Sequence, residues 1–232
     1  MEKEFKPMDR KVPEKILAIE TSGKTLGAAL LSNPAQGCPR LLGEISLDAG
    51  FRHSEVLSQA CRFLVHGAGF KLGDLTGLAV STGPGSFTGL RVGVAYARTL
   101  AQFLKVPLIG VNAFEILARQ AGRDPGAQAK WVCVIIDSIG GDFYLGIFKP
   151  GSLKPAEPYR VISKKDLERK LAKLNGKKVL FSSTFTPKAS DLGAIALERF
   201  AKAKAGDWKK VVPFYLRAPI AVERGQEYRK RR

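Results

Sequence analysis

Apolar residues near the start of the chain fall into short runs that favour β-strands. Residues 16–32 read ILAIETSGKTLGAALLS, and the polar stretch Ser22-Gly23-Lys24 divides two apolar runs as a hairpin turn does. A third run, LLGEISLD at 41–48, can supply another strand. The pattern predicts that three antiparallel strands begin the fold.

The next segment has the spacing of an amphipathic helix. Over residues 54–69 the apolar side chains recur three and four positions apart, with Ser54 as a candidate N-cap and a glycine at the end. Residues 75–104 then predict a buried strand, a turn rich in glycine and proline, and a long helix. Residues 106–122 repeat this strand and helix in shorter form.

The pattern restarts at Trp131, which predicts an internal duplication. It comprises a hairpin-like pair at 131–148, a helix near 163–173, a strand at 178–184 and a helix near 190–203. Two α/β subdomains follow from this repeat, with the change of composition at 121–130 between them. We divide the chain into a leader (1–14), an N-terminal α/β subdomain (15–112), a C-terminal α/β subdomain (113–207) and a basic tail (208–232).

The charge of the chain is strongly basic and unevenly distributed. Lys and Arg number 38 against 21 Asp and Glu, which gives a formal net charge of +17 and a pI near 10.0. Up to Val106 there are 13 basic and 9 acidic residues, and the remainder holds 25 and 12. The excess in the second half indicates either a polyanionic partner or a solvated basic surface.

The cysteines and the apolar runs indicate a cytoplasmic protein that does not enter a membrane. Cys38, Cys61 and Cys133 are odd in number and widely spaced, which favours buried thiols in a reducing compartment over a disulfide framework or a zinc knuckle. No apolar run approaches the ~18 residues that a membrane span requires.

The segment STGPGSFTGLRVG at 81–93 predicts a sharp turn followed by a helix. Ser86 or Thr88 can cap that helix, and an anion could bind its first N–H groups. The spacing matches neither a Walker A loop nor a nucleophile elbow, so a purely structural turn stays equally open. A stripe of small residues follows at intervals of four: Gly89, Gly93, Ala97 and Ala101. It allows close approach either to the sheet of its own subdomain or to a helix of another chain.

Five segments together resemble the TsaB (YeaZ) family: ILAIETSGKTLGAALL, FRHSEVL, STGPGSFTGLRVGVAYARTLA, PLIGVNAFEILA and PFYLRAP. The resemblance implies an α/β fold of the actin- and Hsp70-like (ASKHA) ATPase type, with two duplicated subdomains. It also implies a role in threonylcarbamoyl modification of the adenosine next to the anticodon, in tRNAs that read codons starting with A. The implied partners are a TsaD-type catalytic subunit, a TsaE-type ATPase, tRNA within the complex and a second copy in a homodimer, with no membrane.

The same resemblance predicts that this chain has no catalytic or metal-binding residue and no cofactor. In the catalytic paralogue, two histidines four apart bind the metal, and the VNAFEILA segment has Ala113 and Leu117 in those places. Neither side chain can donate a lone pair to a metal. Glu115, between them, is then a surface residue, a helix cap or a relic. The remaining histidines, His53 and His66, lack ligand spacing.

Two glycine-containing turns resemble altered phosphate-binding turns of this fold. Thr21 and Ser22 belong to the first, and Asp137 and Gly140 to the second, so we predict a vestigial nucleotide site. The sequence leaves two alternatives open: an ATP-dependent phosphotransferase of the same fold, and a stand-alone RNA-binding protein.

Two surfaces are predicted to bind partners. Capping is favoured over acid–base chemistry for His53-Ser54-Glu55, and the two helices are expected to contact another protein through the following residues: His53, Ser54, Glu55, Leu57, Cys61, Leu64, Gly89, Arg91, Gly93, Ala97 and Ala101. The basic tail is expected to contact tRNA phosphates through Arg224, Arg229, Lys230, Arg231 and Arg232.

Overall fold

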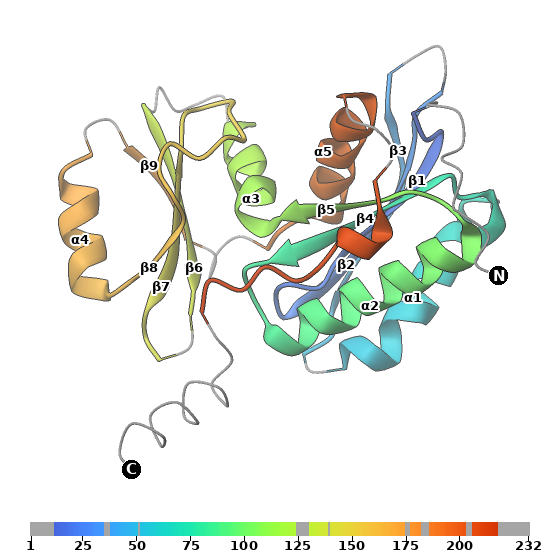
Figure 1. Ribbon diagram of the computed structural model, residues 1–232, viewed down its shortest axis with the longest axis horizontal. Helices are drawn as coiled ribbons and strands as arrows, with labels where there is room; N and C mark the ends of the chain where they lie inside the picture. Colours follow the sequence, from blue (N-terminus) through green and yellow to red (C-terminus); the bar gives the residue numbers. More distant parts are fainter. Residues whose placement is uncertain are drawn as a thin grey trace.

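Two β-sheets, each covered by helices on both faces, form the molecule (Figure 1). The computed structural model describes residues 12–34, 38–50, 52–123, 130–138, 140–174, 177–181, 186–202 and 206–217. Among the described residues, none of the helices is long and apolar enough to cross a membrane.

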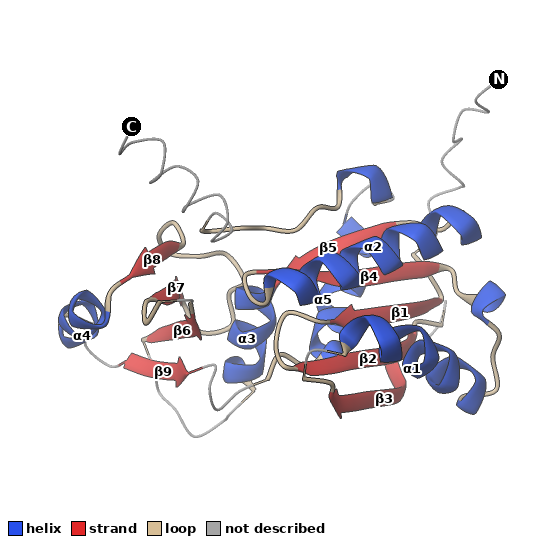
Figure 2. Cartoon of the chain, turned by 90° about the horizontal axis from the view of Figure 1, so that it is seen from below, coloured by secondary structure: helices blue, strands red, loops and turns tan. Residues whose placement is uncertain are grey.

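The first sheet has five strands in the order β3-β2-β1-β4-β5 (Figure 2). The strands are β1 (Lys15–Glu20), β2 (Thr25–Ser32), β3 (Arg40–Asp48), β4 (Gly77–Gly83) and β5 (Leu108–Asn112). β1, β2 and β3 pair antiparallel, as the sequence predicted, whereas β4 pairs parallel to β1 and β5 parallel to β4.

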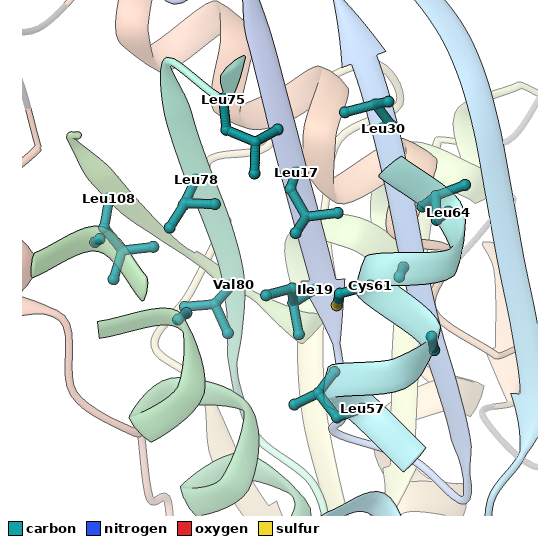
Figure 3. Packing of buried hydrophobic residues seen from close by; sticks show 14 of the residues in the cluster. Leu17, Ile19, Leu30, Leu57, Cys61, Leu64, Leu75, Leu78, Val80 and Leu108 are labelled. Carbon is teal, nitrogen blue, oxygen red and sulfur yellow. The ribbon is translucent and has the colours of Figure 1, made fainter. Parts of the chain in front are cut away.

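Alternate residues of the central strands face two different helical layers, as a pleated strand requires. Leu17 and Ile19 face helices α1 (His53–Gly67) and α2 (Phe87–Leu104), and Figure 3 shows this core with Leu57 and Cys61 of α1. Ile16 and Ala18 face helix α5 (Ala189–Lys202) on the other side. The sequence places residues 189–202 in the C-terminal subdomain, whereas in the structure α5 packs on the first sheet.

The second sheet has four strands in the order β8-β7-β6-β9. They are β6 (Trp131–Asp137), β7 (Phe143–Phe148), β8 (Arg160–Ile162) and β9 (Lys177–Phe181). Helix α3 (Ala113–Gly122) covers one face, where Phe114 packs with Val132 and Val134. Helix α4 (Lys164–Ala172) covers the other with Leu167. The order of strands and helices repeats in the two halves of the chain, as a duplicated α/β unit requires.

The structure confirms the predicted cap of α2 and contradicts the predictions for the cap of α1 and for Cys38. Ser86 caps α2, because its Oγ accepts a hydrogen bond from Gly89 N at 3.2 Å. The predicted cap Ser54 is wrong: α1 begins at His53, so Arg52 is at the N-cap position, two residues before Ser54, and no side chain caps the helix there. Cys38 is exposed rather than buried, because it lies before β3 at the surface.

Two short 3-10 helices were not predicted, η1 (Leu72–Asp74) and η2 (Trp208–Lys210). After η2, residues 211–217 run extended from the first subdomain to the second, and we call this segment the strap (Figures 1 and 2). Val211 packs in the core under α1 and α2, and Leu216 packs against the cluster under α3. The strap therefore touches both halves of the molecule.

Candidate functional site

Glu115, at the centre of the VNAFEILA segment, caps helix α3. Its Oε2 accepts a hydrogen bond from Asn112 N at 3.0 Å, and Asn112 Oδ1 accepts one from Phe114 N at 2.9 Å. Arg199 of α5 donates to Glu115 Oε1 at 2.5 Å and to Gly110 O at 2.9 Å. Of the three roles considered for this acid, capping is the one that the geometry matches.

The neighbours of Glu115 are apolar and closely packed. Ala113 and Leu117 are buried in the cluster between α3 and the second sheet. His53 is buried and His66 exposed, at opposite ends of α1. Within the described residues there is no group of three or more His, Cys, Asp or Glu side chains that could hold a metal ion.

The first candidate phosphate turn lies directly beneath the start of α2. Ser22 O accepts a hydrogen bond from Ser86 N at 2.7 Å, and a Cβ added at Gly85 would overlap that same carbonyl oxygen. A Cβ at Gly89 would overlap Thr21 O. Thr21 and Ser22 are both buried, so the start of α2 covers these two residues of the turn.

Glu20 is fully buried beside this turn. Its Oε1 accepts a hydrogen bond from Ser22 N at 2.6 Å, and its Oε2 has no hydrogen-bond partner among the described residues. Burial raises the pKa of the Glu20 carboxyl above its ordinary value of 4.5, against the opposing effect of its hydrogen bonds to Ser22. The protonated form is therefore favoured over a wider pH range than in a solvated glutamate.

We expect Glu20→Gln to stabilise the chain at pH 8 but not at pH 4. A carboxyl with a raised native pKa holds its proton more tightly when folded, so its contribution to stability falls as the pH rises from about 4.5 through the native value. The neutral glutamine avoids this loss, and we expect a melting temperature ~2 to 4 °C higher, as ~1 kcal/mol gives in a chain of this size. Thermal unfolding followed by circular dichroism between pH 4 and 8 measures it, with the exposed Glu55→Gln as control. A difference independent of pH would contradict the assignment.

The second candidate turn is occupied by the strap. Asp137 ends β6, and Gly140 follows with a φ of 90° that favours glycine. Arg217 Nη1 lies 3.1 Å from Asp142 Oδ2, in the same turn. Its guanidinium therefore lies beside the backbone of Gly140 and neutralises the acid there.

A hollow of about 400 Å³ lies between β2, β3, α3 and the start of α5. Two backbone N–H groups that could bind an anion there, those of Lys188 and Ser190, already donate hydrogen bonds to side chains of the protein. Glu44 Oε1 accepts a hydrogen bond from Ser190 N at 2.9 Å, and Gln120 Oε1 accepts one from Lys188 N at 3.1 Å. A carboxylate of the protein itself thus occupies the N-terminal end of α5.

A network of charges joins α3 to α5 near this hollow. Asp191 is 0 % exposed, and its Oδ1 lies 2.7 Å from Arg123 Nη2 and 3.7 Å from Arg119 Nε. Arg119 also contacts Glu198 at 2.7 Å. Burial raises the pKa of Asp191, whereas the two arginines oppose that rise. The network fixes the second subdomain against a helix of the first.

The residues predicted to bind a protein partner divide into two groups. The buried ones are His53, Leu57, Cys61, Leu64, Gly89, Gly93, Ala97 and Ala101. Of the predicted set, only Ser54, Glu55 and Arg91 are exposed. The small-residue stripe faces Thr21 and the sheet of its own subdomain, so it forms no exposed face, and we correct that part of the prediction.

The outer faces of α1 and α2 carry two large aromatic side chains that the sequence reasoning missed. Phe63 of α1 is 74 % exposed and Phe103 of α2 is 80 % exposed. Both lie at positions where the helical pattern leaves the apolar face, which is the sequence signal that could have identified them. The five predicted tRNA contacts, from Arg224 to Arg232, lie outside the described residues.

Comparison with known proteins gives consistent matches. A family model described as "TsaD: tRNA N6-adenosine threonylcarbamoyltransferase" matches residues 47–151. The Bacillus subtilis "tRNA threonylcarbamoyladenosine biosynthesis protein TsaB" is 34 % identical over 62 % of this chain, which spans 59 % of that protein. The Escherichia coli protein of the same name is 26 % identical, with 89 % of this chain and 96 % of that protein covered.

The solved structure "YeaZ from Pseudomonas aeruginosa" has the same fold. It superposes with a TM-score of 0.72 at 24 % identity, and covers 88 % of this chain and all of that one. A second structure from that organism, with similarity to peptidase YEAZ, gives a TM-score of 0.73 at 23 % identity. The expected α/β fold with two subdomains is thereby confirmed.

Proposed function

The chain belongs to the TsaB (YeaZ) family, and from that premise we propose that it is a non-catalytic subunit of a tRNA threonylcarbamoyltransferase. It acts in the biosynthesis of threonylcarbamoyladenosine in tRNA, the process named in its curated relatives. In this proposal it pairs with a TsaD-type metalloenzyme in the cytoplasm, and a TsaE-type ATPase joins the pair.

One observation carries the proposed pairing: the exposed aromatic residues on α1 and α2. Phe63 and Phe103 leave most of their rings in water, although both belong to helices whose inner faces are well packed. Exposed aromatic side chains of this size are typical of protein interfaces. Glu55 and Arg62, also exposed on α1, can supply polar contacts at the edge of such an interface.

The buried segment at the start of α3 supports a non-catalytic role. The resemblance places metal-binding histidines of the paralogue at the positions of Ala113 and Leu117, and here both side chains are packed in a core. An ATP-dependent phosphotransferase is supported less, because Thr21 and Ser22 are buried under α2 and Glu44 occupies the start of α5. The purified chain alone should then not turn over ATP.

We expect Phe103→Asp and Phe63→Asp each to weaken binding to a TsaD-type subunit by tenfold or more. A charge would replace a ring that is buried in the complex, and aromatic residues dominate interface energetics. Titration calorimetry with the purified subunit measures the affinity. Val161→Asp, at an exposed apolar position on β8, serves as control and should bind within twofold of the parent.

Two outcomes would refute parts of this proposal. If both phenylalanine variants keep the parental affinity, α1 and α2 are not the docking face. If the parent chain neither binds a TsaD-type subunit nor stimulates threonylcarbamoylation of tRNA by it, the pairing itself is wrong.

We also propose that the tail from Arg224 to Arg232 contacts tRNA phosphates in the complex. The support is the concentration of basic residues at the end of the chain. Because such contacts are to phosphates, they would raise affinity without choosing the sequence.

A further inference from the structure

The strap and η2 form a fixed ledge along one side of α2. Phe214 N donates a hydrogen bond to Thr82 O at 2.7 Å, and the Tyr215 ring lies 5.0 Å from the Phe87 ring at the start of α2. At the other end, the Trp208 ring lies beside Arg98. Trp208 and Tyr215 therefore flank two successive regions of the same helix, and the segment runs antiparallel to α2 (Figure 1).

Cationic side chains lie over Trp208 of this ledge and over Phe87 of α2, the ring that Tyr215 contacts. The guanidinium carbon of Arg91 lies 4.1 Å from the centre of the Phe87 ring. Arg98 and Lys209 lie 5.8 and 5.7 Å from the centre of the Trp208 ring. Each distance is within the range of cation–π attraction. Arg91 and Arg98 are seven residues apart, so they share one face of α2 about 10 Å apart along the axis.

We call the basic and aromatic surface formed by α2, η2 and the strap the strip. It consists of six residues: Arg91, Arg98, Trp208, Lys209, Lys210 and Tyr215.

The strip has an excess of positive charge at its η2 end. The Lys210 side chain is 85 % exposed, and its Nζ lies 4.0 Å from Asp207 Oδ2. Asp207 also caps η2, since its Oδ1 accepts a hydrogen bond from Lys209 N at 2.9 Å. At the other end Arg217 is paired with Asp142. Asp207, whose side chain is 42 % exposed, is thus the carboxylate beside Lys210 at this end of the strip.

The strip offers two kinds of contact at once. Tyr215 is 39 % exposed and presents part of a ring that no apolar core covers completely. An exposed ring at one end of a strip that carries Arg91, Lys209 and Lys210 suits a partner that has both stackable rings and a row of negative charges. Nucleic acid has this combination, because a base can stack on an aromatic side chain while phosphates contact lysine and arginine. An acidic protein segment would match the charges but would leave the ring without a stacking partner.

We propose that this strip binds single-stranded RNA without regard to sequence. Lys209, Lys210 and Arg91 contact phosphates, and one base stacks on Tyr215. The identification of this RNA as an unpaired part of tRNA rests on the proposed function, whereas binding by the isolated chain does not. The strip shares no residue with the tail proposed above or with Phe63 and Phe103, and Arg91 belongs both to the strip and to the predicted partner-binding residues.

The experiment measures binding of the full chain to a fluorescently labelled, unstructured RNA oligonucleotide at several salt concentrations. The double variant Lys209→Glu/Lys210→Glu should bind at least tenfold more weakly at low salt, with a salt slope smaller by about 1.4, as the loss of two phosphate contacts predicts. Tyr215→Ala should weaken binding about 5- to 100-fold, and Tyr215→Phe should restore it. The matched control is Lys164→Glu/Lys165→Glu, which makes the same change of charge on exposed residues of α4 and should bind within twofold of the parent.

Three results would overturn the proposal. One is a parent chain that does not bind the oligonucleotide. Another is a control variant on α4 that loses as much affinity as the variant on η2, since binding would then follow total charge alone. The third is a Lys209→Glu/Lys210→Glu variant that keeps its RNA affinity but no longer binds a TsaD-type subunit, because the strip would then be a protein-docking surface. Failure of the TsaD pairing with RNA binding intact would instead count against the proposed function.

Discussion

Replacing Gly93 with leucine is expected to lower the free energy of unfolding by ~2 kcal/mol or more. A Cβ at this position would overlap Thr21 Oγ1, which is part of a buried, β-branched side chain with little freedom to move. Leucine adds three further carbon atoms in the same direction. The gain in helix propensity of ~1 kcal/mol is smaller than the expected strain of ~3 kcal/mol or more.

The matched control for this substitution is Ala95→Leu, at an exposed position of the same helix. It should change the free energy of unfolding by less than ~0.5 kcal/mol. Urea unfolding followed by circular dichroism compares the two variants. A Gly93→Leu variant with parental stability but reduced affinity for a TsaD-type subunit would mean that the stripe faces a partner, as the sequence alone also allowed.

The second large effect is expected from Arg199→Met. Arg199 is the ion-pair partner of Glu115, which is 14 % exposed, and it also donates to Gly110 O. Methionine keeps the apolar stem but leaves a nearly buried carboxylate and a carbonyl without their donor. We expect a loss of ~2 to 4 kcal/mol in the free energy of unfolding.

A double substitution separates the charge from the packing. Glu115→Gln combined with Arg199→Met removes both charges, so its loss should be smaller than that of Arg199→Met alone. Glu198→Gln, in a more exposed pair with Arg119, is the control and should cost less than ~1 kcal/mol. Equal losses for the single and double variants would show that Glu115 is not destabilised by the absence of Arg199.

Elements with a strong local signal were predictable from the sequence. The β1–β2 hairpin follows from two apolar runs around a glycine turn, and the Ser86 cap follows from a hydroxyl at the start of a helical pattern. The Ser54 cap failed because a hydroxyl inside the first turn looks the same in sequence as one at the N-cap. Local rules identify the candidates, and the path of the chain before the helix chooses between them.

The location of α5 could not be predicted from the sequence. An amphipathic pattern shows that a helix has an apolar face, but it does not show which sheet that face packs on. Gly193 lets α5 approach Leu31 and Ala18 of the first sheet. The same uncertainty applies to the small-residue stripe of α2. Gly93 and Ala97 indicate close approach, but only the three-dimensional structure shows that Thr21 and the sheet provide the contact.

The strip on α2 was out of reach for a related reason. Arg98 and Trp208 come from distant parts of the sequence, and no periodicity connects them. The sequence did indicate excess positive charge in the second half. Its arrangement around aromatic rings depends on where residues 206–217 return to the first subdomain.

The return of α5 to the first sheet has a consequence for synthesis on the ribosome. The strands of that sheet leave the exit tunnel long before residues 189–202, so the side of the sheet bearing Ile16, Ala18 and Leu31 lacks the α5 side chains that cover most of it while the second subdomain is being made. The first half of the chain therefore cannot complete its fold as a separate unit in the order of translation. Nascent chains that stall before residue 189 would present this apolar surface to chaperones or to one another.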